Sequence, residues 1–479
     1  MKYCTNILQY IKGNTRYFLM VVMLTTILPS CKKFVTVENP PGILTTEKVF
    51  ADDRSATSAI VSIYIDMMNY QFGSDGSFVC FSMTALAGFS GNELQWTQSN
   101  VNTPAFQEFT THDLTPPNPN VAAFWKDGYN YIYRANAILE GIAASTGMTA
   151  DGKKLVEGEA KFIRGFCYFY LVNLFGDVPL VLSTNYQANM NMARTPSAMV
   201  WEQILNDLKD AKQLLPANYP TPERLRPNRA TVGALLARTY LYLGRWAEAE
   251  AESDAIITSG VYGASLPALD LVFKKESTET IWQLQPVRAG INTNEAFFFL
   301  TTVVDTRPSY EITQNLLSAF EPNDKRKTQW IGFNSPVANP TWAFPAKYKA
   351  GTSVTVTEYY IVFRLTEQYL IRAEARAHQG GSKLAQAITD LNIVRSRAGL
   401  PAANPADQNA FYLAMEKERQ VEFFAEWGHR WLDLKRTNRA EAVLKPLSPT
   451  NSWKPGSELF PVPAGEIGNN PLLVQNPGY

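Results

Sequence analysis

The sequence contains few cysteine and histidine residues. Among its 479 residues there are three histidines and only four cysteines, Cys4, Cys31, Cys80 and Cys167. No two cysteines have the Cys-x-x-Cys spacing, which argues against a zinc ribbon, a dithiol redox motif or a scaffold built on disulfides. We therefore expect neither a metal site nor a redox cofactor from these residue types.

The sequence also lacks an excess of charge and the motifs of common enzymes. Lys plus Arg and Asp plus Glu are both 44, so the formal net charge is zero and nothing favours a nucleic acid as partner. HExxH, GxSxG, GxGxxG, Walker and EF-hand motifs are all missing. With 46% hydrophobic and 18% charged residues, the composition is typical of a folded globular protein. We expect no catalytic residues and no cofactor.

No hydrophobic run is long enough to span a membrane, but one short run lies near the N-terminus. Tyr17–Leu28 contains about a dozen residues after three basic ones, whereas a spanning helix needs about 20. Such a run is typical of a secretion signal. It ends in LPSC, which resembles a lipobox whose cysteine is acylated. We predict a signal peptide over 1–30, lipidation of Cys31 and a tether over 31–45; the alternative is an ordinary signal followed by an incidental cysteine.

Helical periodicity dominates the rest of the chain. Residues 121–144 and 153–175 repeat apolar positions at helical spacing. Segments 230–260 and 364–397 each resemble a tetratricopeptide helix pair, with small residues at the contact and glycine at the turn. Such pairs cannot bury their faces alone and stack on neighbours. We predict a mainly α fold, in which tetratricopeptide-like helix pairs form a scaffold that carries long irregular loops and a few short strands.

A cluster of charged residues near the C-terminus has two interpretations. Its signs alternate at i,i+3 and i,i+4 spacing, which is typical of ion pairs on a helix, although an acid/base site is the alternative. We favour ion pairs at a helix end that packs onto the repeats. The cluster consists of Glu416, Glu418, Arg419, Glu422, Glu426, His429, Arg430, Asp433, Lys435 and Arg436.

Two long segments, 71–115 and 265–358, lack helical periodicity and are rich in Gly, Asn, Thr and aromatic residues. Within the second we expect short strands at 280–284 and 354–360. An aromatic ring can stack on the C–H face of a sugar, while amide side chains bind the hydroxyl groups. For each ring the alternative is that it packs its loop onto the helices. The candidate ligand-binding residues are Asn92, Gln95, Trp96, Trp330, Phe333, Trp342 and Tyr348.

Several segments, in order along the chain, resemble the SusD/RagB family of outer-membrane nutrient-binding lipoproteins. After the lipobox-like LPSC they are FWKDGYNYIYRANAILEGI (124–142), GEAKFIRGFCYFYLVNLFGDVPLV (158–181), RLTEQYLIRAEA (364–375), LNIVRSRAGL (391–400), ERQVEFFAEWGHRWLDLKR (418–436) and LFPVPAGEIGNNPLLVQNPGY (459–479). Together these segments extend over nearly the whole chain.

The resemblance implies a SusD-like N-terminal region over 46–225 and a RagB/SusD C-terminal region over 226–479, with the ligand site in loops 71–115 and 286–348. It implies a lipid-anchored protein of the outer membrane that faces the cell surface. There it would capture an oligosaccharide, or in some members a peptide, without catalysis. Its partner would be a SusC-like TonB-dependent transporter. Two alternatives are a lipoprotein glycosidase and a tetratricopeptide assembly factor without a small ligand.

Overall fold

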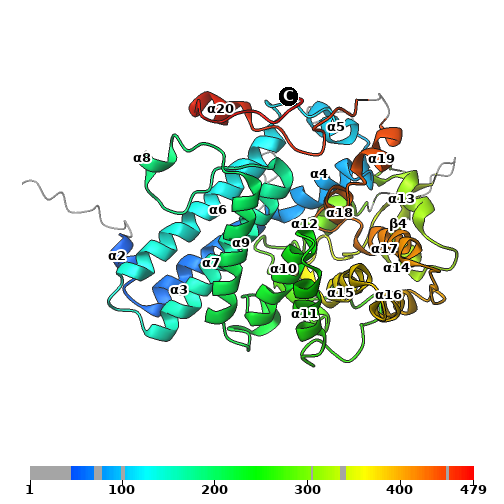
Figure 1. Ribbon diagram of the computed structural model, residues 1–479, viewed down its shortest axis with the longest axis horizontal. Coiled ribbons are helices and arrows are strands. Elements are labelled where there is room, and N and C mark those ends of the chain that lie inside the picture. Colours follow the sequence, from blue (N-terminus) through cyan, green and yellow to red (C-terminus); the bar gives the residue numbers. More distant parts are fainter. Residues whose placement is uncertain are drawn as a thin grey trace, which may run out of the picture. The chain divides into compact units, whose positions relative to one another are not determined.

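Long helices from the N-terminal half of the chain lie side by side, on the left of Figure 1. Local signals set their ends: the Asn118 side chain accepts hydrogen bonds from two backbone N–H groups at the start of α6, and Gly176 takes a φ of +72° after α7. The helical segments expected at 121–144 and 153–175 are confirmed. The helices are α3 (Asp53–Met68), α6 (Pro119–Ala144), α7 (Ala150–Phe175) and α9 (Ser197–Leu214).

The computed structural model describes residues 45–69, 78–98, 103–301, 303, 306–334, 341–448 and 452–479. The expected signal peptide over 1–30 and Cys31 lie outside the described residues, as does the tether apart from its last residue. Contacts separate residues 1–46 from residues 47–479, and only the second unit is discussed below. In the described part of the chain, no helix has both the length and the apolar character needed to cross a bilayer.

The two expected helix pairs are both present and lie against each other. The first consists of α10 (Arg229–Tyr242) and α11 (Trp246–Ile257), and the second of α15 (Leu365–Gln379) and α16 (Lys383–Arg397). Gly244 and Gly380 turn the chain between the helices with φ of +67° and +69°, which only glycine adopts without strain. Helix α11 packs along α15, so the pairs stack as repeat architectures require. The mainly α fold is confirmed.

The strands are short, and those in the described residues form three antiparallel pairs. Strand β2 (Thr280–Leu284) has the predicted bounds and pairs with β6 (Tyr360–Arg364). The prediction of a strand over 354–360 was wrong by about one strand length. Val354 is 98% exposed, whereas all five residues of β6 are buried, so burial against β2 selects the later segment.

The loop predicted over 71–115 contains two helices, α4 (Met83–Ser90) and α5 (Thr103–Thr111). All eight residues of α4 are buried. A helix that is enclosed on every side needs no polar face, so its sequence has no amphipathic period to detect. The other short elements are α2 (Thr46–Val49), η2 (Phe78–Ser82), α8 (Tyr186–Asn189), η3 (Pro222–Arg224), α12 (Asn294–Phe299), α13 (Gln314–Ala319), α14 (Lys325–Trp330), α19 (Ala440–Leu444), η4 (Lys445–Leu447) and α20 (Ala464–Asn469).

The C-terminal charged cluster lies on α17 (Gln408–Phe423) and α18 (His429–Arg436), with Glu426 in the turn between them, and forms ion pairs, as we favoured. Most partners, however, come from other elements rather than from the same helix. Arg326 Nη1 of α14 donates to Glu418 at 2.6 Å and to Glu422 at 2.9 Å. These side chains are buried, so the cluster ties elements together inside the protein and does not form a solvated helix face.

Candidate functional site

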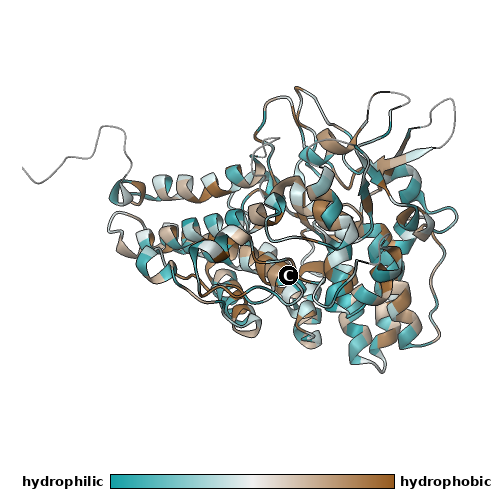
Figure 2. Cartoon of the chain, turned by 90° about the horizontal axis from the view of Figure 1, so that it is seen from above, coloured by the Kyte–Doolittle hydropathy of each residue, from teal (hydrophilic) through white to brown (hydrophobic). Residues whose placement is uncertain are grey.

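Four short strands bring together the two loop regions in which a ligand site was expected. Strand β1 (Leu94–Trp96) pairs with β3 (Tyr310–Ile312), and β4 (Ile331–Asn334) pairs with β5 (Trp342–Pro345). Strand β3 also lies beside β5, so all four form one group, which we call the strand cluster. In Figure 1 its strand β4 is labelled on the right, at the other end from the long helices α3 and α6, and in Figure 2 strand arrows lie on the right.

Trp96 ends β1 with its ring held in one orientation. The ring packs edge-to-face against Phe106, with centroids 4.9 Å apart, and against Tyr310 at 5.0 Å. Its Nε1 donates a hydrogen bond to Thr103 Oγ1 at 3.3 Å. The side chain is only partly buried, so the ring combines a fixed position with a surface open to solvent.

The two polar residues predicted beside Trp96 are partly exposed and have different local roles. Asn92 adopts a left-handed conformation (φ +54°), and its carbonyl accepts a hydrogen bond from Thr313 Oγ1 at 2.7 Å. Gln95 Nε2 donates to Glu311 Oε2 at 3.0 Å, across the β1–β3 pair. Arg307 also pairs with this carboxylate, at 2.6 Å. Because neighbours along a strand point to opposite sides, the Gln95–Glu311 pair lies on the other face of the β1–β3 ribbon from the Trp96 and Tyr310 rings.

Phe333 and Trp342 both retain solvent contact, but the strand register places them on opposite faces of the β4–β5 ribbon. Phe333 lies opposite Ala343, and Asn334 lies opposite Trp342. Because side chains alternate between faces along a strand, neighbours such as Phe333 and Asn334 point to opposite sides. Phe333 is 48% exposed and Trp342 is partly buried. A ligand on one face of the ribbon therefore contacts one of these rings.

Trp330 and Tyr348 lie in the core. Trp330 is 0% exposed, and its Nε1 donates to the Leu269 carbonyl at 3.0 Å. The Tyr348 hydroxyl accepts a hydrogen bond from the backbone N–H of Ile361 at 2.9 Å. For these two rings the alternative interpretation fits the structure, because both fix a loop segment to the scaffold and neither offers a ring face to solvent.

Two buried carboxyl groups at the strand cluster were not found from the sequence. Glu93 directly precedes β1 and Glu295 lies on α12; each is 1% exposed. Burial raises the pKa of Glu93 to about 8 and the pKa of Glu295 to about 7. The Glu93 side chain is close to Trp96 in the sequence but points inward, where Oε2 accepts a hydrogen bond from the Ala425 N–H at 3.4 Å.

The Glu93→Gln variant is expected to reduce the loss of stability at alkaline pH. The folded state raises the pKa of Glu93 from 4.5 to about 8, so it binds more protons than the unfolded chain between these values. The free energy of unfolding therefore falls as the pH rises through this window. Glutamine keeps the acceptor oxygen without the charge, so the fall between pH 5 and pH 8.5 should shrink by on the order of 3 kcal/mol.

Urea unfolding of both proteins at the two pH values measures this effect. Glu202→Gln, on the exposed side of α9, is the matched control and should leave the pH dependence of the wild type unchanged. An identical pH dependence in Glu93→Gln and the wild type would show that the Glu93 carboxyl is not held protonated in the fold.

In the part of the chain that the structure describes, no group of three or more His, Cys, Asp or Glu side chains is arranged to hold a metal ion. The chemistry available at the strand cluster is that of aromatic faces, amides and one ion-paired carboxylate. Such groups bind a polar ligand that has apolar faces.

Comparison with known proteins identifies relatives of the whole chain. One family model, described as starch-binding associating with the outer membrane, matches residues 64–241, and a second, described as the SusD family, matches residues 337–479. A SusD-like protein from Formosa agariphila, P2, is 26% identical over 97% of this chain and 100% of its own length.

Solved structures share the fold. A SusD superfamily protein from Bacteroides vulgatus superposes with a TM-score of 0.78 at 21% identity, over 89% of this chain and 99% of that one. A laminarin-binding SusD-like protein superposes with a TM-score of 0.73 at 24% identity, over 89% of this chain and 99% of its own. With both family models matched in order and relatives aligned from end to end, the chain belongs to the SusD/RagB family.

Proposed function

We propose that the protein captures a glycan on the strand cluster and holds it without cleaving it. Trp96 carries this proposal, because Phe106 and Tyr310 fix its partly exposed ring at the end of β1. A sugar offers C–H faces to an aromatic ring and hydroxyl groups to amides. Asn92 is partly exposed and lies in the same short segment as Trp96, so we expect it to contact hydroxyl groups of a sugar on this ring, whereas Gln95 points to the other face of β1.

The family relationship supports a glycan as the ligand. One matching family model is described as starch-binding, and one relative of known structure is described as laminarin-binding. The Glu93 and Glu295 side chains are each 1% exposed, so neither carboxyl is open to a ligand on the strands.

Binding without cleavage is the form of this proposal that fits the carboxyl groups near the strands. A glycosidase needs two carboxyl groups about 5–9.5 Å apart that face the scissile bond. Glu93 and Glu295 are each 1% exposed, and Glu311 is tied to Arg307 and Gln95. None of these three carboxyls is placed to act as a free acid or nucleophile on a bound sugar.

A panel of polysaccharides tests the proposed function. Native gels cast with single polysaccharides, including laminarin and starch, should retard the purified protein for at least one of them. Incubation with the same glycans should release no shorter product. Retardation by none of them, together with binding of peptides in solution, would favour the peptide alternative; release of oligosaccharides would favour the glycosidase alternative.

We also propose that the protein is tethered to the outer membrane through Cys31 and passes its ligand to a SusC-like TonB-dependent transporter. The support is the resemblance of the LPSC segment to a lipobox and the outer-membrane description of the first matching family model. A lipid tether leaves the folded part free to move over a transporter, whereas no spanning helix is needed for that role.

The Cys31→Ser variant is expected to leave the membrane fraction. Without the thiol the lipid cannot be attached, and the protein loses its hydrophobic anchor. Cell fractionation with immunodetection compares the variant with the wild type and with Cys4→Ser, which removes a cysteine at the start of the signal and should remain membrane-bound. Retention of Cys31→Ser in the membrane fraction would contradict lipidation at this residue.

A further inference from the structure

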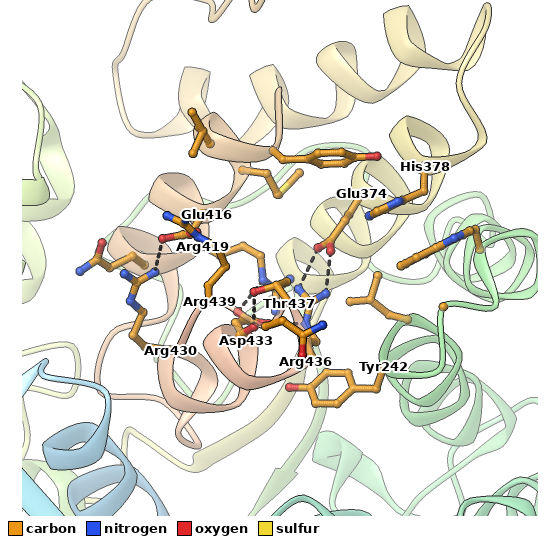
Figure 3. Close-up of a pocket in the computed structure, with 18 of the residues that line it drawn as sticks. Tyr242, Glu374, His378, Glu416, Arg419, Arg430, Asp433, Arg436, Thr437 and Arg439 are labelled. Atoms are coloured by element: carbon orange, nitrogen blue, oxygen red, sulfur yellow. Dashed lines mark hydrogen bonds and ion pairs between the residues drawn. The ribbon is translucent and has the colours of Figure 1, made fainter. Parts of the chain in front are cut away.

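A cleft lies between the first helix pair, the end of α15 and the C-terminal helices α17 and α18 (Figure 3). It has a volume of about 710 Å³, which is within the usual range for sites that bind small molecules. The α10–α11 turn, the end of α15 and helices α17 and α18 supply its walls. No lining residue belongs to β1, β3, β4 or β5, so this site is independent of the proposed glycan surface.

The charged side chains of the cleft do not balance. Glu374 pairs with Arg436 at 2.6 Å, whereas Glu416 accepts hydrogen bonds from both Arg430 and Arg439, at 3.3 and 3.0 Å. His378 adds no charge at neutral pH, because burial lowers its pKa. One positive charge is therefore left over in a lining that contains Arg419, Arg430, Arg436, Arg439, Glu374, Glu416 and Asp433.

Three donors in the cleft wall have no acceptor among the described residues: Arg419 Nη1, Arg430 Nε and the Tyr242 hydroxyl. The two arginines are 4% and 6% exposed, so water does not easily replace the missing partner. Burial raises the pKa of Tyr242, so its hydroxyl keeps its proton and remains a donor. All three donor atoms are enclosed in the wall, so an acceptor in the cleft reaches them only if the side chains around them shift.

The remaining wall is a stack of three rings. The His378 ring lies 3.8 Å from the Trp246 ring and nearly parallel to it, and 4.5 Å from the Tyr412 ring on its other side. All three residues line the cleft. The stack gives this side of the cleft fixed aromatic groups, with the two faces of the His378 ring covered by its neighbours.

We propose that this cleft binds a small molecule with one carboxylate on a ring or apolar body. Each arginine of the lining already has a carboxylate partner, but four arginines share three carboxylates, so one added negative charge would balance the lining. The planar guanidinium group of an arginine matches the geometry of a carboxylate, whose two oxygens accept hydrogen bonds from guanidinium N–H groups. The Tyr242 hydroxyl supplies a third donor, and the ring stack contacts the body of the ligand. An acidic sugar and the C-terminal residue of a peptide both have this chemistry.

Titration calorimetry on the purified full-length chain tests the proposal with three probes: galacturonate, its neutral counterpart galactose, and N-acetylphenylalanine. We expect at least one carboxylate to bind with a Kd below about 10 mM, galactose not to bind, and binding to weaken as salt is added. Binding of galacturonate alone indicates an acidic sugar as the natural ligand, binding of N-acetylphenylalanine alone indicates a peptide end, and binding of both supports the carboxylate site itself. Binding of neither, or equal binding of galactose, overturns the proposal.

Two variants assign the binding to the cleft. Arg439→Gln removes the excess charge from a side chain that is 43% exposed, and Tyr242→Phe removes a hydroxyl that makes no hydrogen bond in the fold. Each should weaken carboxylate binding by roughly fivefold or more. Arg229→Gln and Tyr186→Phe, at exposed positions outside the cleft, should not. If Arg439→Gln fails to fold, Tyr242→Phe decides alone; unchanged affinity in Tyr242→Phe overturns the assignment.

Discussion

Replacing Glu422 by glutamine is expected to lower the free energy of unfolding by about 3–5 kcal/mol. Glu422 is fully buried and accepts hydrogen bonds from Arg364 at 2.6 Å, from Arg326 at 2.9 Å and from Arg397. Burial alone would raise the pKa of Glu422, but the three guanidinium groups hold it well below its ordinary value. Glutamine has nearly the same shape but no charge, so three buried cations lose a shared counter-ion.

We expect a large loss of stability in Glu422→Gln because these arginines join separate parts of the protein. Arg326 belongs to α14 and Arg364 to β6, while Glu422 lies on α17. Urea unfolding monitored by circular dichroism measures the effect. Glu441→Gln on α19 is the matched control, since the Glu441 side chain is 60% exposed and pairs with Lys445 at 2.9 Å; we expect a change within about 0.5 kcal/mol.

A loss below about 1 kcal/mol in Glu422→Gln would contradict the structural role of the charged cluster. Such a result would favour the alternative that these carboxylates serve acid/base chemistry, because neutralising one of them would then leave the stability of the fold unchanged.

The second large effect is expected on ligand binding: Trp96→Ala should weaken glycan affinity by roughly 30-fold or more. Phe106, Tyr310 and the hydrogen bond to Thr103 already fix the ring in the free protein. Binding a ligand therefore costs little side-chain conformational entropy at Trp96. Titration calorimetry with the glycan that retards the protein measures the loss. Trp96→Phe keeps an aromatic face and should recover part of the affinity, which separates stacking from general damage to β1.

The β4–β5 ribbon allows a second prediction about glycan affinity, for Phe333 and Trp342. Phe333 and Trp342 lie on opposite faces, so only one of Phe333→Ala and Trp342→Ala should weaken binding strongly. Tyr133→Ala on α6, where the ring is 52% exposed and away from the strands, is the control for loss of an exposed aromatic residue. Full affinity in Trp96→Ala would contradict the proposed site.

The helical scaffold could be predicted from the sequence because its signals are local. Glycines with positive φ after α7, α10 and α15 end those helices where the sequence indicates. Repeated small and apolar positions likewise predict the two helix pairs. Helix α4 could not be predicted in this way, since a helix buried on all sides has no polar face and its surroundings come from distant segments.

The candidate site was predictable as a pair of regions but not residue by residue. Trp330 and Phe333 are three positions apart, among similar polar neighbours, yet one is 0% and the other 48% exposed. Their burial depends on how β4 pairs with β5 and on what covers the end of α14, which are long-range features. Glu93 is a similar case: its polar sequence neighbours do not show that its carboxyl lies in the interior.

A crystal structure of the protein with the glycan that retards it in native gels tests the central claim most directly. We expect a sugar ring over the face of Trp96, with a hydroxyl group within hydrogen-bond distance of the Asn92 side chain and the glycosidic bonds intact. A glycan bound elsewhere, with the strand cluster empty, or density for a cleaved product would contradict it.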